Sequence, residues 1–538
     1  MRHNMNDGRA LRSELTKFTM NKNIIHIQGK IDNQNDVPIS LRMKLRNVVK
    51  TEYVDIPLEQ VNELGEWYQF KVKIDLNTIA FQTFFWDIYV CTASKQEVLL
   101  EVHLMKIKKR LEKWLIRYTC KFSNGYLVFP YLAGKGEHRC LAFQYRKSHE
   151  YDTVYYKLKE VFAIWLYKSC QFYFKKKRYW MICEKFAKKA QDNGYYFFQY
   201  CCENQQNKDI YYLIDKRSKD YEKLKPYKKN VISFMSLKHL IYIQAPCVLI
   251  TTETRNHYYA WKAGRGRMKV YIRRQPYVFL QHGVFGFKKV NNFLKESANP
   301  VDLFITSSEF EKKIVMDYMG YESHEVVVTG LARWDAKVRG EKRREILFLP
   351  TWRNWLDDVT TEYFIESDYY KKYLSLLKEP KLEALLKKYD VTLHFVLHPL
   401  FEQHISSFTT DSQHIIIHQD QQISIHELLD RCAMLVTDYS SVAWEMYYDK
   451  KPVVFYRFDQ DMYEECQGSY IELSDDVVGH SVNTEDELLC QLERYIQTDF
   501  TEEEQFGKER STYFKYCDQE NSKRIYQEIN QFLMKKGY

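Results

Sequence analysis

The sequence predicts an α/β protein in which two doubly wound parallel sheets face each other across a cleft, preceded by a small β-rich domain. From Asp209 onward, short runs that are apolar on both faces alternate with helical stretches, which is typical of parallel sheets covered by helices on both sides. The same alternation starts again after Arg344, so the chain holds enough strands for two such sheets. Before Leu104, strand-like pieces with period two follow one another directly, which predicts β structure without helices.

Length and composition fit several folded domains. The chain has 538 residues, of which 45% are hydrophobic and 28% charged, with a net charge of +9. It is too long for one hydrophobic core and too apolar for a disordered chain. We divide it into a β-rich accessory domain (1–105), a basic, aromatic helical linker (106–200), a first Rossmann-like half (201–335) and a second Rossmann-like half with a C-terminal helix (336–538).

Cysteine usage and hydropathy indicate a cellular compartment. The 12 cysteines form no CxxC pair, so we expect neither a zinc site nor a disulfide framework, but free thiols in a reducing cytosol. Residues 1–20 are polar and no run reaches the length of a membrane span, which argues against a signal peptide and a transmembrane helix. We therefore expect the protein to meet the cell membrane peripherally, from its cytoplasmic face.

The β-rich region is predicted to form a sandwich of modest size. Its pieces alternate apolar and polar residues and are separated by turn signals such as residues 33–36. They are residues 24–27, 40–45, 67–72 and 86–90. None carries a catalytic pattern, so acceptor binding, partner docking and plain support all stay open as roles.

Two basic amphipathic segments follow. In residues 106–118 the apolar side chains fall on one helical stripe, formed by Ile107, Leu111, Trp114, Leu115 and Tyr118. Residues 165–189 carry four consecutive basic residues at 175–178 beside Tyr179 and Trp180. Such segments can lie on an anionic membrane surface, where each basic residue contributes about 1 kcal/mol. They can also pack on the next domain with a solvated basic face; we predict membrane contact for the second segment and leave both possibilities open for the first.

The strands of the two parallel sheets are predicted from their apolar runs. For the first sheet these are residues 210–214, 230–234, 247–251, 278–280, 303–306 and 326–330; for the second they are residues 346–349, 391–397, 414–417, 434–436 and 453–455. Helical stretches at 237–244, 308–318, 370–389 and 424–431 separate them. Ligands of such sheets bind at the carboxyl ends of the strands, so the residues that follow each strand are the candidates for a site.

Polar residues do follow five of these strands. They are His282 and Gly283 after 278–280, Arg333 and Asp335 after 326–330, Pro350, Thr351 and Arg353 after 346–349, His398 after 391–397, and Asp438, Ser440 and Ser441 after 434–436. Each alone has a simpler explanation, because a histidine after a strand is more often structural and an arginine in a turn is common. Together they predict a site that holds or transfers a phosphoryl group.

The stretch at 433–459 is the centre of this prediction. An apolar run, a polar turn, a helical segment from Val442 and a second apolar run at 453–455 indicate a strand, a turn, a helix and a strand. Ser440 or Ser441 is a natural N-cap, and the free N–H groups of a helix N-terminus attract an anion such as phosphate. For such a pair taken alone, ordinary helix capping is the commoner role.

Several motifs carry a resemblance to a known family. The sequence contains QHGVFGFKK (281–289), TGLARWD (329–335), LFLPTWRN (347–354), LHPL (397–400) and VTDYSSVAWE (436–445). In this order they resemble the motifs of the CDP-glycerol glycerophosphotransferase family, the teichoic acid primases and polymerases. Residues 187–215 are similar to the segment that opens the catalytic region of that family. The likeness covers roughly residues 180–530, and the chain before residue 106 lies outside it.

The resemblance implies a GT-B architecture and transfer of glycerol phosphate from CDP-glycerol to a hydroxyl of a growing polymer or lipid-linked acceptor, with release of CMP and without a metal or other cofactor. The second half would bind the CDP donor and the first half the acceptor. Carried over by position, His282 and His398 would be the essential histidine pair. The donor would contact Gly283, Arg333, Pro350, Thr351, Ser440, Ser441 and Glu445, supported by Asp335, Arg353 and Asp438.

The residue types suit this chemistry. An imidazole titrates near neutrality, so His282 is expected to take the proton of the acceptor hydroxyl and His398 to hold phosphate, although the two roles could be exchanged. Arg333 and the hydroxyls of Ser440 and Ser441 would stabilise the charge on the leaving CMP in place of a metal.

Two departures leave the transferred polyol open. Residues 284–288 read VFGFK where many members have a small residue, Pro, Leu and Lys, and Glu445 stands where Asp is usual. CDP-ribitol therefore stays open as the donor, and a capsule as the product beside teichoic acid. A GT-B glycosyltransferase that uses a sugar nucleotide and a non-catalytic, membrane-associated scaffold are the alternatives. Nucleic-acid binding is not expected, because no recognised module accompanies the basic patches.

Overall fold

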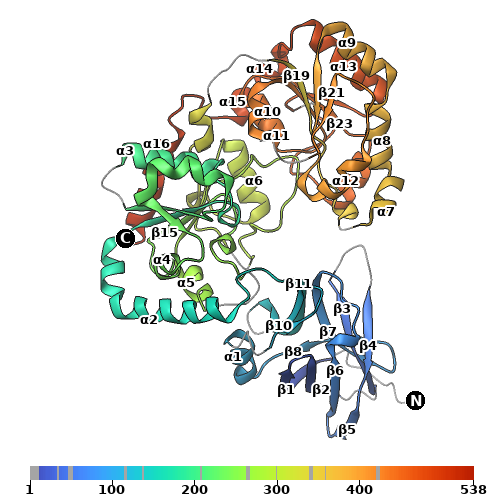
Figure 1. Ribbon diagram of the computed structural model, residues 1–538, viewed down its shortest axis with the longest axis vertical. Helices are drawn as coiled ribbons and strands as arrows, with labels where there is room; N and C mark the ends of the chain where they lie inside the picture. Colours follow the sequence, from blue (N-terminus) through green and yellow to red (C-terminus); the bar gives the residue numbers. More distant parts are fainter. Residues whose placement is uncertain are drawn as a thin grey trace, which may run out of the picture. The chain divides into compact units, whose positions relative to one another are not determined.

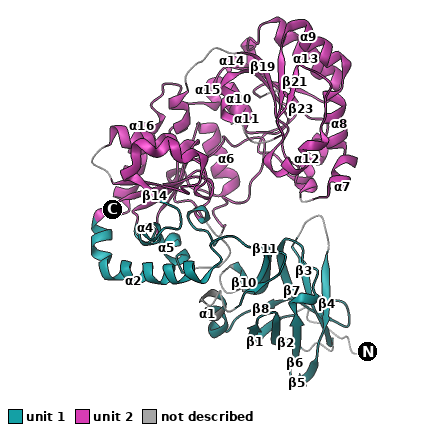
Figure 2. Ribbon diagram, in the orientation of Figure 1, with its two compact units in different colours: residues 1–176, 233–245, 256–274 teal, residues 177–232, 246–255, 275–538 magenta. Residues whose placement is uncertain are grey.

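The computed structural model (Figure 1) describes residues 11–32, 36–46, 52–113, 118–135, 138–205, 209–261, 267–297, 300–337, 343–357, 359–419, 425–475 and 477–538. The chain divides into two compact units, which Figure 2 colours teal and magenta. The first unit comprises residues 1–176, 233–245 and 256–274, and the second comprises residues 177–232, 246–255 and 275–538.

The described part of the first unit contains a mainly antiparallel sheet of eleven strands. These are β1 (Ser13–Asn21), β2 (Ile24–Asp32), β3 (Pro38–Leu45), β4 (Tyr53–Pro57), β5 (Gln60–Leu64), β6 (Trp67–Asp75), β7 (Phe84–Thr92), β8 (Glu97–Glu101), β9 (Cys120–Lys121), β10 (Tyr126–Lys135) and β11 (His138–Lys147). Alternate residues are buried, as in β6, where Phe70 and Val72 point inward. Leu41 of β3 shares one core with Ile27 of β2, although these strands are not neighbours. The predicted sandwich is thus one continuous sheet curled around its own apolar face.

This sheet extends past the boundary expected at residue 105. β10 pairs with β11 along its whole length, and β11 joins β7, with Phe143 opposite Trp86. Strands β10 and β11 lie between the two basic amphipathic segments, 106–118 and 165–189, from which a helical linker is predicted. The helix expected from residue 106 is α1 (Met105–Lys113), and its Ile107 and Leu111 are buried in the core of the sheet. Of the predicted stripe, Trp114 and Leu115 lie outside the described residues.

The first unit also contains α2 (Val154–Lys177), α4 (Leu237–Tyr242) and α5 (Lys269–Arg274). α2 buries Glu160, Ala163 and Tyr167 on one face. Gln244 donates from Nε2 to the carbonyl oxygen of Ala163 at 3.2 Å, and Tyr271 packs edge-on against Tyr167. None of the helices in the described part of the chain is both long and apolar enough to cross a bilayer.

Two parallel sheets make up most of the second unit. The seven-stranded sheet has the order β14-β13-β12-β15-β16-β17-β18, and the six-stranded sheet has the order β21-β20-β19-β22-β23-β24. The first consists of β12 (Trp180–Cys183), β13 (Ile210–Ile214), β14 (Val231–Ser233), β15 (Val248–Thr251), β16 (Tyr277–Phe279), β17 (Leu303–Thr306) and β18 (Val326–Val328); the second consists of β19 (Arg343–Phe348), β20 (Thr392–Phe395), β21 (Ile415–Ile417), β22 (Cys432–Thr437), β23 (Val453–Tyr456) and β24 (His480–Val482). In both sheets successive strands are added first toward one edge and then toward the other, so the strand order switches between β12 and β15 and between β19 and β22. Doubly wound proteins bind ligands at such switch points.

Helices cover both faces of these sheets. In the second sheet, Phe348 and Val436 belong to one buried cluster, whereas their neighbours Leu347 and Leu435 belong to another on the opposite face. Burial on both faces explains why the strands are apolar without alternation. The helices of the unit are α3 (Asn193–Asn204), α6 (Glu309–Met319), α7 (Thr361–Glu366), α8 (Asp368–Leu377), α9 (Pro380–Tyr389), α10 (Ile425–Arg431), α11 (Val442–Tyr448), α12 (Gln460–Cys466), α13 (Glu485–Gln497), α14 (Glu504–Lys508), α15 (Arg510–Tyr513) and α16 (Asn521–Lys535).

Two elements differ from their predicted assignments. Tyr179 and Trp180, expected at a membrane surface, are fully buried, and Trp180 begins β12 in the middle of the first parallel sheet. The C-terminal helix α16, expected in the second half, packs on the first: Ile525, Ile529 and Leu533 share a core with Trp180. These three side chains have the spacing i, i+4, i+8 and form the apolar stripe through which α16 packs.

Candidate functional site

The loop after β16 carries His282 and is hydrogen-bonded to the buried carboxyl group of Glu311. Gln281 has a positive φ of 67°, which turns the chain sharply out of the strand. Its Nε2 atom donates to Oε1 of Glu311 at 3.0 Å, and the backbone N–H of Phe285 donates to the same oxygen at 2.8 Å. Ser307 donates its N–H to the other oxygen of Glu311. Through these hydrogen bonds the Glu311 side chain fixes the loop at Gln281 and at Phe285. Burial raises the pKa of Glu311 to about 7.

The imidazole of His282 is exposed and has a defined orientation. Its Nδ1 atom lies 3.1 Å from the carbonyl oxygen of Thr252, the residue after β15. A carbonyl oxygen only accepts hydrogen bonds, so Nδ1 must carry the proton in this contact. In the neutral ring, Nε2 then has a free lone pair and can accept a proton.

Arg333 connects this loop to the second half of the unit. Nη1 donates to the carbonyl oxygen of His282 at 3.1 Å and to Oδ1 of Asp192 at 2.5 Å, and Nη2 contacts Oε1 of Glu445. The backbone N–H of Arg333 donates to Asn193, whose own amide donates to the carbonyl oxygen of Gln281. Arg333 is only 5% exposed, so it positions the His282 loop and does not present an open guanidinium surface.

Glu445, on α11, is the partner of Arg333 in the second half. Its second carboxylate oxygen accepts from Nε1 of Trp334 at 2.9 Å and lies 3.4 Å from Nζ of Lys337. Burial opposes ionisation of Glu445, but the charges of Arg333 and Lys337 outweigh it and hold its pKa below the usual range. Both oxygens are engaged by protein groups, which differs from the direct donor contact expected from the sequence.

Asp438 and Arg353 form a second buried network under the turn that follows β22. Nη1 of Arg353 lies 2.8 Å from Oδ2 of Asp438, and both side chains are fully buried. Asp438 accepts from the backbone N–H and the hydroxyl of Thr351, and Arg353 also pairs with Asp459 through Nε and Nη2. The network joins the ends of β19, β22 and β23. Thr351 and the buried Pro350 are thus fixed next to the turn that carries the serine pair.

Ser441, which follows Ser440 in the turn after β22, lies against the His282 loop. A Cβ atom on Gly283 would come within 2.7 Å of the Ser441 hydroxyl oxygen and 3.2 Å of its Cβ. Ser441 is at the N-cap position of α11 without a capping hydrogen bond from its side chain, whereas the hydroxyl of Ser440 accepts from the N–H of Val442 at 3.3 Å. Phe287 stacks on Trp444 of α11 with ring centroids 5.2 Å apart. The loop of the first half therefore packs directly on α11 of the second.

His398 has the opposite hydrogen-bond pattern to His282. It follows β20 at the start of η8 (Pro399–Ser407), and its Nδ1 atom accepts from the backbone N–H of Leu400 at 3.2 Å. An N–H only donates, so Nδ1 is unprotonated and the neutral ring carries its proton on Nε2. Burial, together with the charges of Lys288 and Lys185, lowers the pKa of His398 to about 4. It is therefore a neutral hydrogen-bond donor at physiological pH.

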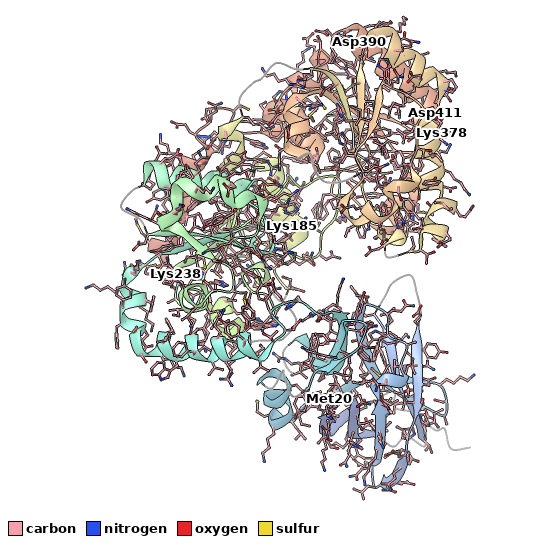
Figure 3. All side chains as sticks on the ribbon, viewed as in Figure 1. Met20, Lys185, Lys238, Lys378, Asp390 and Asp411 are labelled. Atoms are coloured by element: carbon pink, nitrogen blue, oxygen red, sulfur yellow. The ribbon has the colours of Figure 1, made fainter. Side chains whose placement is uncertain are left out.

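Two lysines near His398 were not singled out from the sequence. Lys288 lies in the His282 loop with its Nζ 4.8 Å from the ring centroid of Trp352. Lys185, labelled in Figure 3, belongs to η2 (Lys185–Ala187) directly after β12. Both charges act on His398. Lys288 stands in the quoted QHGVFGFKK motif, so its position after a strand was the signal that could have identified it.

Asp335 has a structural role. Its carboxylate accepts from the backbone N–H groups of Asn521 and Ser522, at 2.9 and 2.6 Å, and so caps the start of α16. Gly330, with φ of 79°, lies so close to Asn521 that a side chain would clash. Asp335 thereby anchors the C-terminal helix to the first half.

Apart from the candidate site, a cluster among the described residues has the composition of a metal site. It consists of Glu345, His394 and Cys432, with ligand atoms within 4.8 Å of one another. Arg431 already lies on it, with Nε 2.5 Å from Glu345 and Nη2 3.2 Å from Nε2 of His394. Glu345 and Cys432 are near the amino ends of β19 and β22, away from the carboxyl ends where the histidines lie. A guanidinium therefore occupies the position that a cation would take.

Comparison with known proteins identifies the family. Residues 166–531, more than half of the chain, match the family model described as CDP-Glycerol:Poly(glycerophosphate) glycerophosphotransferase. The chain belongs to this glycerophosphotransferase family. The candidate site residues all fall within the matched region, and the family match confirms the resemblance carried by the sequence motifs.

Curated proteins that resemble this chain are named for teichoic acid synthesis. The chain is 26% identical over 372 residues to the minor teichoic acid biosynthesis protein GgaB of Bacillus subtilis (strain 168), covering 66% of this chain and 40% of that protein. It is 25% identical over 240 residues to the teichoic acid ribitol-phosphate polymerase TarK of Staphylococcus aureus (strain NCTC 8325 / PS 47), covering 41% of this chain and 44% of that protein. The chain thus spans less than half of the length of these relatives.

The fold of this chain also matches a solved structure. The wall teichoic acid polymerase TagF aligns with a TM-score of 0.50 and 16% identity, over 72% of this chain and 99% of that chain. At this identity the likeness concerns the fold alone. It agrees with the prediction of an α/β protein with parallel sheets.

Proposed function

We propose that this protein transfers glycerol phosphate from CDP-glycerol to a hydroxyl group of a teichoic acid or capsule-type polymer, or of a lipid-linked acceptor, and releases CMP. Membership of the glycerophosphotransferase family supports the reaction class. In this proposal the two sheets form the GT-B arrangement, with the acceptor on the side of the first half and the CDP donor on the side of the second. No metal or other cofactor takes part.

The opposite protonation of the two histidines carries the proposal. His282 donates from Nδ1 to Thr252 and keeps Nε2 as a proton acceptor, whereas His398 accepts at Nδ1 from Leu400 and keeps Nε2–H as a donor. Transfer of a phosphoryl group to an alcohol needs one group of each kind: a base for the hydroxyl proton and a donor for the phosphate oxygens. This favours His282 as the base and His398 as the phosphate partner.

The bond changes follow from these roles. The acceptor oxygen attacks the phosphorus that bears glycerol, and its proton passes to Nε2 of His282. A new P–O bond forms to the acceptor while the anhydride P–O bond breaks, and the bridging oxygen leaves with the electron pair as part of CMP. The product is a phosphodiester between glycerol and the acceptor. The proton on His282 then returns to solvent.

Charge on the departing CMP requires nearby cations and donors. Lys288 and Lys185 lie close enough to His398 to depress its pKa, and the hydroxyl of Ser441, next to Ser440, lies against Gly283 of the His282 loop. We assign these groups to the diphosphate of the donor, with Pro350 and Thr351 forming the adjacent wall. Arg333 and Glu445 act indirectly, because Arg333 holds the carbonyl oxygen of His282 while Glu445 orients Arg333.

The transferred polyol has a second candidate. The relative TarK is a ribitol-phosphate polymerase, and a site that binds the diphosphate and cytidine would accept CDP-ribitol equally well. The choice between glycerol and ribitol depends on groups around the polyol, so both donors belong in the same assay.

We further propose that α2 rests on the anionic cytoplasmic face of the cell membrane. Before its kink at Cys170, α2 exposes Leu158 and Trp165 opposite its buried face, 65% and 61% exposed, and after the kink it exposes Phe172, 83% exposed. Phe162 stacks on Trp165 at 5.9 Å between centroids, and Lys168, Lys175 and Lys176 are exposed on the same helix. Interfacial helices combine exposed apolar side chains with lysines that contact lipid phosphates.

One assay tests the proposed reaction. The purified chain is incubated with CDP-glycerol, CDP-ribitol or a UDP-sugar and a polyol-phosphate acceptor, and the released nucleotide is measured. CMP release that requires His282 supports the proposal, with His324→Ala as control because His324 is an exposed histidine on another segment. Release of UDP from a UDP-sugar would identify a glycosyltransferase, and full biological function of the His282→Ala protein would identify a scaffold.

A further inference from the structure

The first unit contains a cavity of about 580 Å³. All of its lining residues belong to the teal unit of Figure 2, and none is among those assigned to the transferase site. The walls come from the β1–β2 turn, the segment around β9 and the start of α2, and Trp261 closes one side. The volume falls within the range of natural small-ligand sites, which is about 300 to 1,000 Å³.

The lining of the cavity is electropositive. It contains Lys22, Lys121 and Lys157, against one carboxylate, that of Asp152. Two nitrogens of Arg146 hold the Asp152 carboxylate at 2.8 Å each, so a cation already compensates its charge. Lys22 and Lys121 are exposed at the surface. An anion entering the cavity therefore meets lysines without net repulsion from the aspartate.

The cavity also offers an aromatic wall and neutral polar groups. Trp261 is only 2% exposed, and its Nε1 donates to Oδ1 of Asp152 at 3.2 Å, which fixes the ring. Nζ of Lys157 lies 3.5 Å from the centroid of this ring. Asn77 and Thr119 add an amide and a hydroxyl group to the lining. C–H groups of a polyol pack against an aromatic ring, whereas its hydroxyls bond to amides and hydroxyls.

We propose that this cavity binds a phosphodiester-linked polyol segment, the part of the acceptor polymer that lies away from the reacting hydroxyl. Lysines would meet the phosphates, and Trp261 with the amide and hydroxyl groups would meet the polyol. The nature of the polymer rests on the function proposed above, but its binding does not need turnover. Such a cavity would give the N-terminal β domain a role in acceptor binding.

Calorimetric titration of the full chain with a synthetic trimer of glycerol phosphate, without a CDP donor, tests this assignment. We expect the trimer to bind at low salt, inorganic phosphate to bind at least about tenfold more weakly, and glycerol not to bind. The double variant Lys22→Gln with Lys121→Gln should weaken trimer binding at least about tenfold, because the loss of one charged contact already costs roughly that factor. Lys95→Gln, an exposed lysine in the β7–β8 turn outside the cavity, is the matched control and should bind normally.

The assignment is overturned if the trimer does not bind, if the double variant binds it as the wild type does, or if phosphate alone binds as tightly. A lipid headgroup could present the same phosphodiester, so flotation with phosphatidylglycerol vesicles forms a second arm. Loss of vesicle binding in the double variant, with trimer binding intact, would point to a lipid and overturn the assignment. Trimer binding without CMP release refutes the proposed transfer and leaves the cavity assignment standing. CMP release without trimer binding refutes the cavity assignment and leaves the proposed transfer standing.

Discussion

The Nδ1 atom of His282 is 3.1 Å from the carbonyl oxygen of Thr252, which fixes the tautomer of the exposed imidazole. The carbonyl comes from the end of β15, and the histidine follows its neighbour β16. The sheet therefore sets the orientation of Nε2. A loop alone would leave the ring free to rotate, whereas two adjacent strands present a proton acceptor in one direction.

The first prediction is that His282→Ala lowers kcat. A positioned general base contributes about 10²- to 10⁴-fold, and we expect a loss in this range in CMP release. The KM for CDP-glycerol should change little, because the diphosphate is held by other groups. His324→Ala should leave both parameters unchanged. A variant that loses only donor affinity, with kcat intact, would show that His282 is not the base.

The second prediction concerns His398. Its pKa is lowered to about 4 by burial and by Lys288 and Lys185, so it does not titrate near neutral pH. His398→Ala should raise the KM for the donor about tenfold, the value of one lost hydrogen bond to a charged phosphate. The kcat of this variant should fall far less than that of His282→Ala, because the proposed base is still present. A loss of kcat as large as that of His282→Ala, with the donor KM unchanged, would mean that the roles of the two histidines are exchanged.

The third prediction tests the contact between the two halves. Gly283→Ala places a Cβ 2.7 Å from the hydroxyl of Ser441, so the loop must shift, and overpacking of this kind typically costs about 1–3 kcal/mol. We expect a lower Tm and a lower kcat. Adding Ser441→Ala removes the clashing oxygen and should restore part of the Tm. If the two substitutions act additively, the loop and the serine do not meet in solution.

The fourth prediction concerns the buried pair Arg333–Glu445. Glu445→Gln leaves Arg333 without one of its two carboxylate partners and should cost about 3–5 kcal/mol of unfolding free energy at neutral pH. The pKa of Glu445 is depressed in the folded protein, so its stabilisation is present above the ordinary glutamate pKa of 4.5 and is lost as the pH falls below it.

Thermal unfolding at several pH values checks this sign. The Tm difference between wild type and Glu445→Gln should be largest near neutrality and should narrow below about pH 4.5. Asp486→Asn is the control, since its pair with Lys381 is exposed and should contribute at most about 1 kcal/mol. A difference that grows at acid pH would mean that the carboxylate is not stabilised in the folded state.

The sequence predicted those parts of the fold that depend on local pattern. Runs such as 434–436 are apolar on both faces because clusters on both sides of the sheet bury them, and this is visible without tertiary information. The prediction for Trp180 is wrong because a basic run at 175–178 precedes it, which is typical of a membrane-surface segment. The strand β12 is too short to be distinguished from such a segment by its pattern. α16 was placed with its neighbours in sequence, whereas its apolar stripe packs on the first half.

The site could be predicted in part for the same reason. Strand ends are readable, so the positions of His282 and His398 are known before the structure, but the hydrogen bonds that separate their roles come from Thr252 and Leu400. Glu311 lies in no quoted motif, and Asp192 lies in the 187–215 segment, but both resemble ordinary acids at helix starts. They hold the His282 loop and Arg333 only because distant segments meet. Such positioning residues depend on tertiary contacts and leave little trace in one sequence.

The last prediction tests α2 on a membrane. Trp165→Ser with Phe172→Ser removes two exposed aromatic rings, and each ring buried in the interface should contribute at least about 1.5 kcal/mol. We expect flotation with phosphatidylglycerol vesicles to fall at least about tenfold, while CMP release with a soluble acceptor is retained. Tyr363→Ser is the control, because Tyr363 is 62% exposed on α7. Wild-type binding should weaken with added salt and with neutral lipid. Unchanged flotation of the double variant would show that α2 does not hold the protein on lipid.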